Sequence, residues 1–137
     1  MQTTLIDSGP CIALFDASDN WHRRVVSFMS DFRGQLMTSW AAITEVSHML
    51  DFNLQVQLDF LEWIERGAVK LALIEQTEIY AIRRMMHKYT DVPMNLADAS
   101  LLYLAEREGI KNVVSIDSDF SIYRTRKKQP LTNLLDQ

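Results

Sequence analysis

The sequence predicts an α/β fold of three layers, a central parallel sheet of about four or five strands flanked by helices. Short apolar runs alternate with segments of helical periodicity along the whole chain. No Gly/Ser/Pro-rich linker, repeat or low-complexity run interrupts this alternation. The chain has 137 residues, 47% of them hydrophobic, which is enough to bury one core. We therefore expect residues 1–137 to form a single domain.

The chain begins with the run "TTLI", which predicts a strand over residues 3–6. The segment 8–17 then predicts a helix with Ser8 as its N-cap. A second helix is expected over residues 20–32, because its apolar residues recur at helical spacing, and Gly34 marks its end.

The middle of the chain repeats this order of elements. Residues 35–38 predict a strand, and "WAAITEVSHMLD" predicts a helix over residues 40–51. The segment 54–66 is apolar on most of its circumference and stops before Gly67, so we expect a helix that its neighbours largely cover. The run "VKLALI", residues 69–74, predicts the third strand.

A fifth helix is indicated by an apolar stripe of four residues, Ile79, Ile82, Met86 and Tyr89. The turn "DVP" at residues 91–93 closes it. Asn95 can cap the next helix, which ends at Gly109.

The C-terminal part of the chain supplies the remaining strands. Residues 112–116, "NVVSI", predict the fourth strand. A short basic helix or turn over residues 119–128 precedes a possible last strand at 131–135. Strands separated by helices imply right-handed crossovers, and hence a parallel sheet covered on both faces.

Composition limits the classes of function. A net charge of −4 argues against a protein that coats nucleic acid by bulk charge, although local basic patches remain open. The single cysteine, Cys11, cannot form an intrachain disulfide, which fits a reducing compartment. No charged leader or long apolar run indicates export or a membrane span, so we expect a cytoplasmic protein.

Four carboxylates stand where an open parallel sheet binds ligands, at the carboxyl ends of its strands. Asp7 directly follows the first strand and Asp117 the fourth, so the two lie side by side if those strands are neighbours. Glu45 lies on the helix that leaves the second strand, and Asp98 opens the helix that feeds the fourth. All four side chains can converge on one edge of the sheet.

Each acid also has an ordinary structural interpretation. Asp7 could fill a turn or cap, and Glu45 could be an exposed helix acid. Asp98 follows a capping Asn by three residues, an arrangement close to a capping box, and the helix dipole favours a negative charge there. Either Asp117 or Asp119 could cap the final helix. Four clustered carboxylates would, however, repel one another unless a divalent cation neutralised them. An all-oxygen site suits Mg²⁺ or Mn²⁺ rather than zinc.

The sequence resembles PIN-domain ribonucleases of the VapC toxin type. The resemblance is carried by four blocks, "LIDSGPCIALFDASDNWH", "GQLMTSWAAITEVSHML", "YTDVPMNLADASLLYLAE" and "VVSIDSDFSIYR". It covers nearly the whole chain, although residues 53–76 match only in their helix and strand pattern. It implies a PIN-like three-layer fold.

The resemblance also implies a function and a site. The metal-site acids would be Asp7, Glu45, Asp98 and Asp117, with Asp119 and the Ser8 hydroxyl as auxiliaries. Asp91, in the turn before the last long helix, matches the related pattern without a clear role. The implied activity is a Mg²⁺-dependent endoribonuclease, with Mn²⁺ as a substitute, that cuts single-stranded RNA and leaves a 5′-phosphate. The implied partners are a small antitoxin and a second copy of the chain.

Basic residues would have to hold RNA from the rim of such an acidic site. The run "RTRKK" is the first candidate, with Arg124, Arg126, Lys127 and Lys128 as RNA-binding residues. Further candidates are Arg23, Arg24, Arg83, Arg84 and Lys88. The alternative is that these charges are solvated surface. Tyr123 could stack on a base or anchor the last helix in the core.

Histidine chemistry is not indicated. His22, His48 and His87 lie on three different helices, and only His48 shares a face with a proposed acid, Glu45. This spacing argues against metal-free cleavage by a pair of histidines. His48 is otherwise interpreted as an ordinary helix residue.

An apolar stripe on the second helix leaves the question of a partner open. Its members are Trp21, Phe28, Met29 and Phe32. They could fill the core, or part of the stripe could line a groove for an antitoxin helix or a second copy. We expect Phe28 in the core and Trp21 nearer the surface.

Other functions compete with the toxin hypothesis. The same chemistry could serve RNA processing without an antitoxin, and a PIN fold can also be a non-catalytic binding scaffold. A haloacid-dehalogenase-type phosphatase would need a second Asp two residues after Asp7, where this chain has Gly9.

Overall fold

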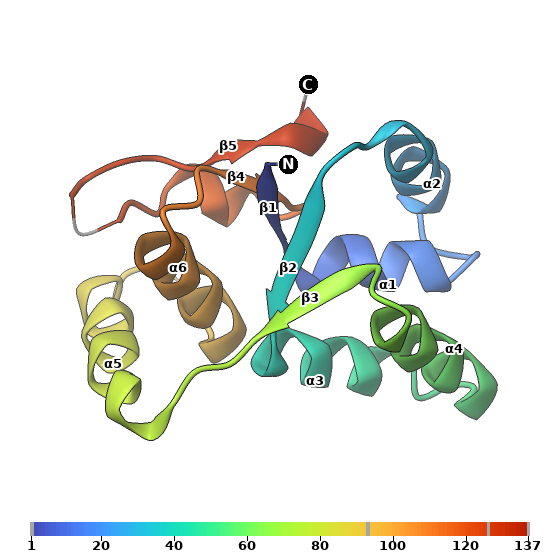
Figure 1. Cartoon of the computed structure of the whole chain (residues 1–137), viewed down its shortest axis with the longest axis horizontal. Helices are drawn as coiled ribbons and strands as arrows, with labels where there is room; N and C mark the ends of the chain where they lie inside the picture. The colour runs from blue at the N-terminus through green and yellow to red at the C-terminus, as the bar shows by residue number, and fades with distance from the viewer. Residues whose placement is uncertain (1, 93, 126, 137) are drawn as a thin grey trace.

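The computed structural model describes residues 2–92, 94–125 and 127–136, and within them five strands form one parallel sheet (Figure 1). The strands are β1 (Thr3–Ile6), β2 (Gln35–Ser39), β3 (Val69–Ala72), β4 (Asn112–Val114) and β5 (Thr132–Asn133). The helices are α1 (Ser8–Phe15), α2 (His22–Asp31), α3 (Trp40–Met49), α4 (Leu54–Glu65), α5 (Ile79–Lys88) and α6 (Leu96–Glu108). Short 3₁₀ turns are η1 (Gln76–Glu78), η2 (Ser118–Ser121) and η3 (Leu134–Asp136). The predicted α/β class is confirmed.

The strand order is β3-β2-β1-β4-β5, so β1 lies at the centre of the sheet. Leu5 of β1 pairs with Met37 of β2 on one side and with Val113 of β4 on the other. The chain builds outward from β1 to β3 and then returns to the other side of β1. The order of strands therefore reverses between β1 and β4, which is where doubly wound sheets bind ligands.

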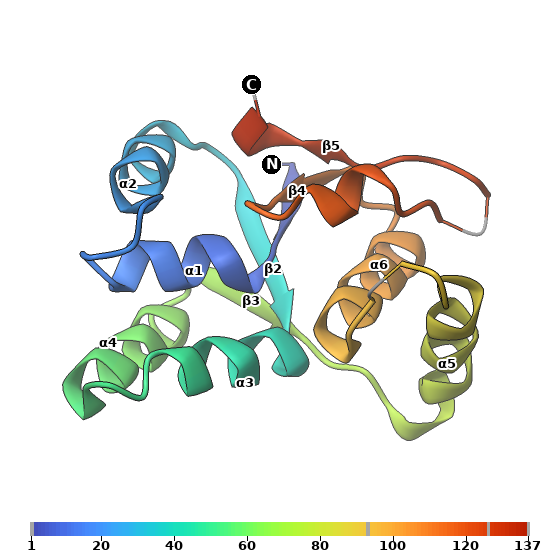
Figure 2. The same ribbon diagram turned by 180° about the vertical axis from the view of Figure 1, so that it is seen from behind.

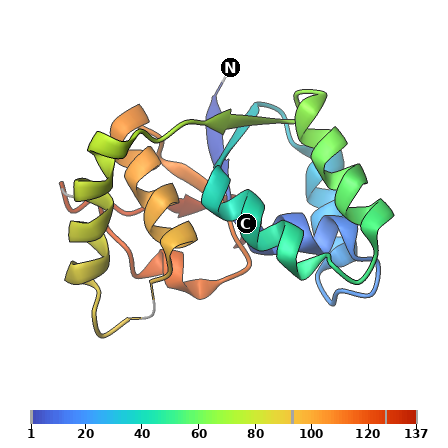
Figure 3. The same cartoon turned by 90° about the horizontal axis from the view of Figure 1, so that it is seen from below.

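The three layers follow from the alternation of side chains along the strands. Leu5 packs in one core cluster with α5 and α6, whereas its neighbour Ile6 packs in the other, with α1 to α4. Met37 and Leu36 divide between the clusters in the same way. Figures 1 and 2 show α5 and α6 on one side of the sheet and α1 to α4 on the other, and Figure 3 shows the same division from below.

Helix ends agree with the sequence except at α1. The predicted N-cap Ser8 is wrong, because Ser8 is the first residue of the helix and Asp7 caps it with its carboxylate. Asp7 has the extended backbone that a cap needs. Asn95 caps α6 as predicted, and Gly109 ends that helix in the left-handed conformation with φ of 67°.

The prediction that neighbours largely cover helix α4 is wrong, because Phe60 is its buried residue while Leu54 and Leu58 are exposed. Which neighbour covers a helix is information that periodicity alone does not contain.

The predicted stripe on α5 is confirmed except at one position. Ile82 is buried, and Met86 and Tyr89 pack against the same core, whereas Ile79 is exposed.

The basic segment after η2 takes the turn alternative rather than a helix. Arg124 pairs with Pro130 in an isolated antiparallel bridge, and the amide of Thr125 donates to the carbonyl of Gln129 at 3.0 Å. Tyr123 is fully buried against Phe120, so it anchors this segment in the core. The predicted sites Arg126 and part of the "DVP" turn lie outside the described residues.

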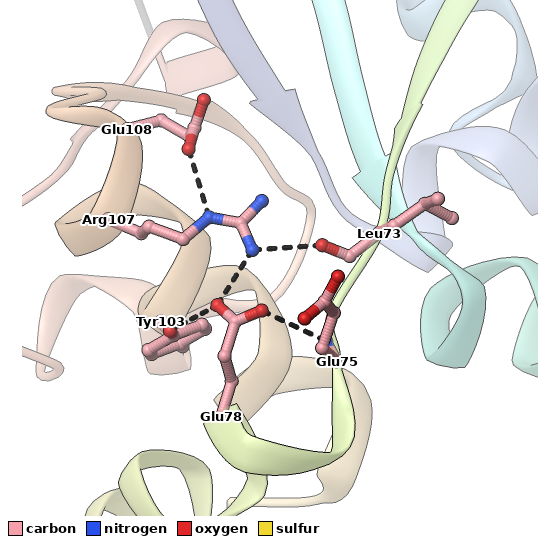
Figure 4. A network of polar contacts seen from close by, with 6 residues as sticks. All are labelled: Leu73, Glu75, Glu78, Tyr103, Arg107 and Glu108. Atoms are coloured by element: carbon pink, nitrogen blue, oxygen red, sulfur yellow. Dashed lines mark hydrogen bonds and ion pairs between the residues drawn. The ribbon is translucent and has the colours of Figure 1, made fainter.

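A polar network joins the segment between β3 and α5 to the end of α6 (Figure 4). The Arg107 guanidinium donates to the carbonyl of Leu73 and to Glu78, each at 2.8 Å. Tyr103 also donates to Glu78. The backbone amide of Glu75, the Tyr103 hydroxyl and Arg107 together lower the pKa of Glu78 to about 2. The network holds α5 in place against α6.

None of the helices within the described ranges combines the length and the apolarity that crossing a membrane requires.

Candidate functional site

The four predicted acids lie at the carboxyl edge of the sheet, on both sides of the point where strand order reverses. Asp7 follows β1, and Asp117 follows β4 and caps η2. Asp98 lies in the first turn of α6, and Glu45 lies within α3. Figure 2 shows the starts of α3 and α6 side by side beyond the tip of β2. The structure therefore brings the four elements together as predicted.

Ser8 connects the first two acids. Its hydroxyl donates to Glu45, and it also lies 3.5 Å from Oδ1 of Asp7. Its backbone amide donates to the same Asp7 oxygen at 2.8 Å. The expected auxiliary Ser8 thus orients both carboxylates from the first turn of α1.

Ser115 connects Asp7 to Asp117. Its buried hydroxyl lies 3.0 Å from Oδ2 of Asp7 and accepts the backbone amide of Asp117 at 3.1 Å. This hydroxyl fixes the direction of the Asp7 side chain and the start of the turn that carries Asp117. Ser115 was missed in the sequence, although a polar residue at the end of the apolar run "NVVSI" was the available signal.

Asn95 and Tyr123 donate hydrogen bonds to Glu45 and Asp98, respectively. The side-chain amide of Asn95 donates to Oε2 of Glu45 at 3.2 Å. The Tyr123 hydroxyl donates to Oδ2 of Asp98 at 3.3 Å. The capping role of Asn95 was predicted, but its contact with Glu45 and the contact of Tyr123 with Asp98 were not.

Burial and neighbouring carboxylates raise the pKa of two of these acids, Asp7 and Asp98. Burial raises the pKa of Asp7 to about 6, with further contributions from the charges of Glu45 and Asp117. Burial and the charge of Asp7 raise the pKa of Asp98 to about 7, and Asp117 adds to the effect. Asp98 is only 7% exposed, which agrees with burial as the largest cause of its raised pKa.

No cation of the described chain compensates these charges. The described ion pairs join Arg66 to Glu62 and Arg107 to Glu78 and Glu108, and none includes the four acids. The hydrogen bonds to the acids come from hydroxyl and amide groups. Buried carboxylates without a counter-ion are costly, which is the condition that a bound cation relieves.

The donor set fits a hard divalent cation. Carboxylate oxygens are the ligands that Mg²⁺ and Mn²⁺ prefer, and neither the described Cys11 nor His48 belongs to the cluster. As their side chains stand, no three described His, Cys, Asp or Glu residues form a group that could hold a metal ion. The acids therefore meet at one edge without closing into a coordination shell.

The other predicted residues divide into two groups. Asp119 adjoins the cluster, because its amide donates to Asp117 at 2.9 Å, and burial together with Asp117 raises its pKa. Asp91 is exposed in the turn before α6. His48 is exposed and lines a hollow of about 450 Å³ between α3 and α4 with Trp40 and other residues, and none of the four acids lines this hollow.

The predicted RNA-binding residues lie beyond Tyr123 in the chain. Arg124 is half-buried, and its guanidinium donates to the carbonyls of Ser121 and Tyr123. Lys127 and Lys128 are exposed. Lys128 has a positive φ of 61°, which fixes the direction of the loop that carries it.

The sequence is similar to a known protein family and to a known ribonuclease. A family model described as "PIN domain" matches residues 4–126. Ribonuclease VapC26 of Mycobacterium tuberculosis is 27% identical over 115 residues, which cover 82% of this chain and 85% of that protein.

Solved structures are similar in fold. The crystal structure of Mycobacterium tuberculosis VapC20, described as a sarcin-ricin loop cleaving toxin, has a TM-score of 0.80 at 16% identity and covers 87% of this chain and 93% of its own. VapBC2 of Rickettsia felis, solved with a DNA fragment from their promoter, has a TM-score of 0.59 at 9% identity, covering 96% and 98%. FitAcB of Neisseria gonorrhoeae has a TM-score of 0.56 at 18% identity, covering 84% and 88%.

Proposed function

The chain belongs to the PIN-domain family, and on that premise we propose that it is a Mg²⁺-dependent endoribonuclease that hydrolyses single-stranded RNA and acts as the toxin of a toxin-antitoxin pair. The resemblance to VapC-type PIN ribonucleases is confirmed by the family match and the similar proteins. One observation carries the proposed activity. Four carboxylates from four separate elements lie at the carboxyl edge of the sheet near its switch point, the charges of Glu45 and Asp117 act on Asp7 and those of Asp7 and Asp117 on Asp98, and no described cation pairs with them.

Asp7, Glu45, Asp98 and Asp117 are the residues that would hold the ion. When bound, Mg²⁺ or its substitute Mn²⁺ would make a coordinated water acidic enough to act as nucleophile and would offset charge on the phosphoryl oxygens. Its charge would also relieve the repulsion that raises the pKa values of Asp7 and Asp98.

The remaining side chains prepare the site. Ser8 and Ser115 hold Asp7 from two sides, and Asn95 holds Glu45. The Tyr123 hydroxyl donates to Oδ2 of Asp98 and limits the directions in which that carboxylate can point. A carboxyl group with a pKa of about 7 can carry a proton on Oδ near neutral pH until a cation displaces it.

The names of the similar proteins support the substrate and the toxin role. One relative is named a ribonuclease, and one solved neighbour is described as a toxin that cleaves the sarcin-ricin loop. By analogy, RNA is the proposed substrate of this chain and a small antitoxin its proposed partner. Large exposed apolar side chains, such as Trp40, Phe52 and Leu54, provide surface that a partner or a second copy could cover.

The organisation of the molecule follows from this proposal. Residues 1–137 would form one PIN domain that works in the cytoplasm as a homodimer. Light scattering on the purified chain measures the homodimer directly, and a monomer at micromolar concentration would contradict it.

The metal site is tested by isothermal titration with Mn²⁺. Wild type should bind Mn²⁺, whereas the affinity of Asp7→Asn and Asp98→Asn for Mn²⁺ should be severely reduced, because each substitution removes a charged ligand from the cluster. Asp59→Asn is the matched control, since Asp59 is an exposed acid on α4. Unchanged binding in both site variants would exclude the proposed metal site.

The reaction is tested with labelled single-stranded RNA. Wild type with Mg²⁺ should produce fragments with 5′-phosphates, and EDTA, Glu45→Gln or Asp98→Asn should stop the cleavage. Metal binding without any cleavage of RNA would favour a binding scaffold. Cleavage by a chain whose expression needs no antitoxin for growth would favour an RNA-processing enzyme.

A further inference from the structure

Positive charge is concentrated in two short segments of this acidic chain. Residues 79–90 and 120–130 contain seven of the fourteen Lys and Arg residues and none of the eighteen Asp and Glu residues. Their formal charge is therefore +7, while the remainder of the chain carries −11. The electrostatic potential near these two segments is therefore expected to be positive, although the net charge of the protein is −4.

The fold brings the two segments together. The Tyr89 hydroxyl accepts the backbone amide of Arg124 at 2.7 Å and lies 3.2 Å from its carbonyl oxygen. Figures 1, 2 and 3 show α5 and the loop after η2 at the same end of the molecule, with α2 and α4 at the opposite end. The candidates Arg23 and Arg24 are thereby separated from the rest, because they lie on α2, where Arg24 donates to the carbonyl of Leu135.

We call the cations of α5 and of this loop, which lie at the same end of the molecule, the basic face. Its described members are Arg83, Arg84, Lys88, Arg124, Lys127 and Lys128. All but the half-buried Arg124 are exposed. The described ion pairs include none of them, so their charges are available to a ligand.

Aromatic rings hold three of these cations in place. The guanidinium groups of Arg83 and Arg84 lie 5.4 and 5.7 Å from the ring centre of Tyr80, and the Lys88 ammonium lies 5.3 Å from that of Tyr89. Cation–π contacts of this kind reduce the conformational entropy that a ligand must remove.

The basic face adjoins the acid cluster through two packed tyrosines. The rings of Tyr89 and Tyr123 are 5.2 Å apart at their centres, and the Tyr123 hydroxyl donates to Asp98. An RNA strand bound to the basic face would therefore lie next to the carboxylates. Its phosphates would contact the cations of the face and would stay apart from the negative charges of the acid cluster.

We propose that the basic face, α5 together with the loop after η2, binds the phosphodiester backbone of single-stranded RNA and directs it into the acid cluster. This inference rests on the proposed nuclease function. It states where the RNA binds, namely on a surface whose described cations come half from α5 and half from the loop. An acidic protein segment is the less favoured occupant, because protein interfaces depend on apolar anchors, whereas the groups exposed along the C-terminal half of α5 are mainly cations.

The test compares two triple variants that change the net charge equally. The first is Arg83→Gln with Arg84→Gln and Lys88→Gln. The control is Arg66→Gln with Lys70→Gln and Lys111→Gln, three exposed cations elsewhere on the chain. Both are made in an Asp98→Asn background, which prevents cleavage, and binding of fluorescein-labelled oligouridine is measured by anisotropy at several salt concentrations.

The α5 triple variant should bind RNA at least about tenfold more weakly at low salt, and the slope of log Kd against log salt should fall by about 2, because each lost contact with a single strand contributes ~0.7. The control should keep the slope of its parent. Lys127→Gln with Lys128→Gln should reduce the slope independently. If the α5 triple variant melts early, the three single variants replace it, and each should remove about one third of the effect.

Three results would overturn the inference. In the first, wild type cleaves RNA and the slope of log Kd against log salt is the same in the α5 triple variant and in the control. In the second, wild type cleaves RNA and only the loop variant, Lys127→Gln with Lys128→Gln, has a smaller slope. In the third, the α5 triple variant keeps its affinity for RNA but loses binding of an acidic protein partner, which would make the face a protein interface.

A failure of the proposed function itself gives a different result. In that case wild type neither binds nor cleaves RNA.

Discussion

Asn95 donates a hydrogen bond to Glu45 at 3.2 Å while its side-chain oxygen accepts the amide of Asp98 at 2.8 Å. One side chain thus caps α6 and orients an acid on α3, 50 residues earlier in the chain. The two roles use different atoms, so substitutions can separate them.

Asn95→Ser should keep the cap and lose the contact with Glu45. Its free energy of unfolding should stay within about 0.5 kcal/mol of wild type, whereas Asn95→Ala should lose about 1 kcal/mol with the cap. Both should weaken Mn²⁺ binding by about tenfold, because both remove the Asn95 hydrogen bond and leave only the Ser8 hydroxyl to orient Glu45. Asn53→Ala, which removes the cap of α4, is the control that should lose stability and keep metal affinity. Full Mn²⁺ affinity in Asn95→Ser would leave Asn95 with the capping role alone.

Asp98 should make the metal-free protein less stable as pH rises. The pKa of Asp98 is about 7 in the folded protein and 3.8 in the unfolded chain. The stability gained by protonating Asp98 is therefore fully present below about pH 4 and is lost as pH rises through about 7. In EDTA, thermal melts of wild type should fall between pH 5 and pH 7.5, and those of Asp98→Asn should fall less. At pH 7.5 we expect Asp98→Asn to be more stable by about 1 to 3 kcal/mol, since one pKa unit corresponds to about 1.4 kcal/mol and solvent screens part of it. A large loss of stability in Asp98→Asn would indicate a structural acid.

The apolar residues near α2 should differ in their effect on stability. Phe60, 1% exposed and packed against the rings of Phe15 and Trp63, serves as a core reference, and Phe60→Ala should cost about 3 to 5 kcal/mol. Trp21 is 41% exposed, so Trp21→Ala should cost less than about 1 kcal/mol. Phe28 is half-buried against the same cluster and should lie between them. Urea unfolding measures all three variants, and a cost for Trp21→Ala equal to that of Phe60→Ala would place Trp21 in the core.

Trp21→Ala also tests the partner. If the stripe on α2 is a docking surface, this folded variant should lose co-purification with the antitoxin and remain toxic in its presence. Undiminished binding and neutralisation would place the antitoxin elsewhere, for example on the exposed side chains of α3 and α4.

Arg107 should control the mobility of α5. Arg107→Gln removes donors to Leu73 and Glu78, so amide hydrogen exchange in α5 should become faster while that in β1 is unchanged. Arg107→Lys should give little rescue, because an ammonium lacks the planar fork that reaches both acceptors. Exchange rates in α5 equal to those of wild type would show that apolar packing on α6 alone holds this helix.

Features that depend only on adjacent residues could be predicted from the sequence. The alternation of strands and helices, the cap at Asn95, the end of α6 at Gly109 and the position of Asp7 directly after a strand all depend on a few adjacent residues. The prediction that Asp7, Glu45, Asp98 and Asp117 form one site also relied on a family resemblance.

Contacts between distant segments depend on how the whole chain packs. The order of strands placed Asp7 beside Asp117, and the packing of the turn after β4 placed Tyr123 on Asp98 and Ser115 on Asp7. The packing of the whole chain also exposed α4 and gathered the cations of α5 and the C-terminal loop at one end. These outcomes depend on which surfaces bury most apolar area against one another, a property of the whole chain that no local window of sequence contains.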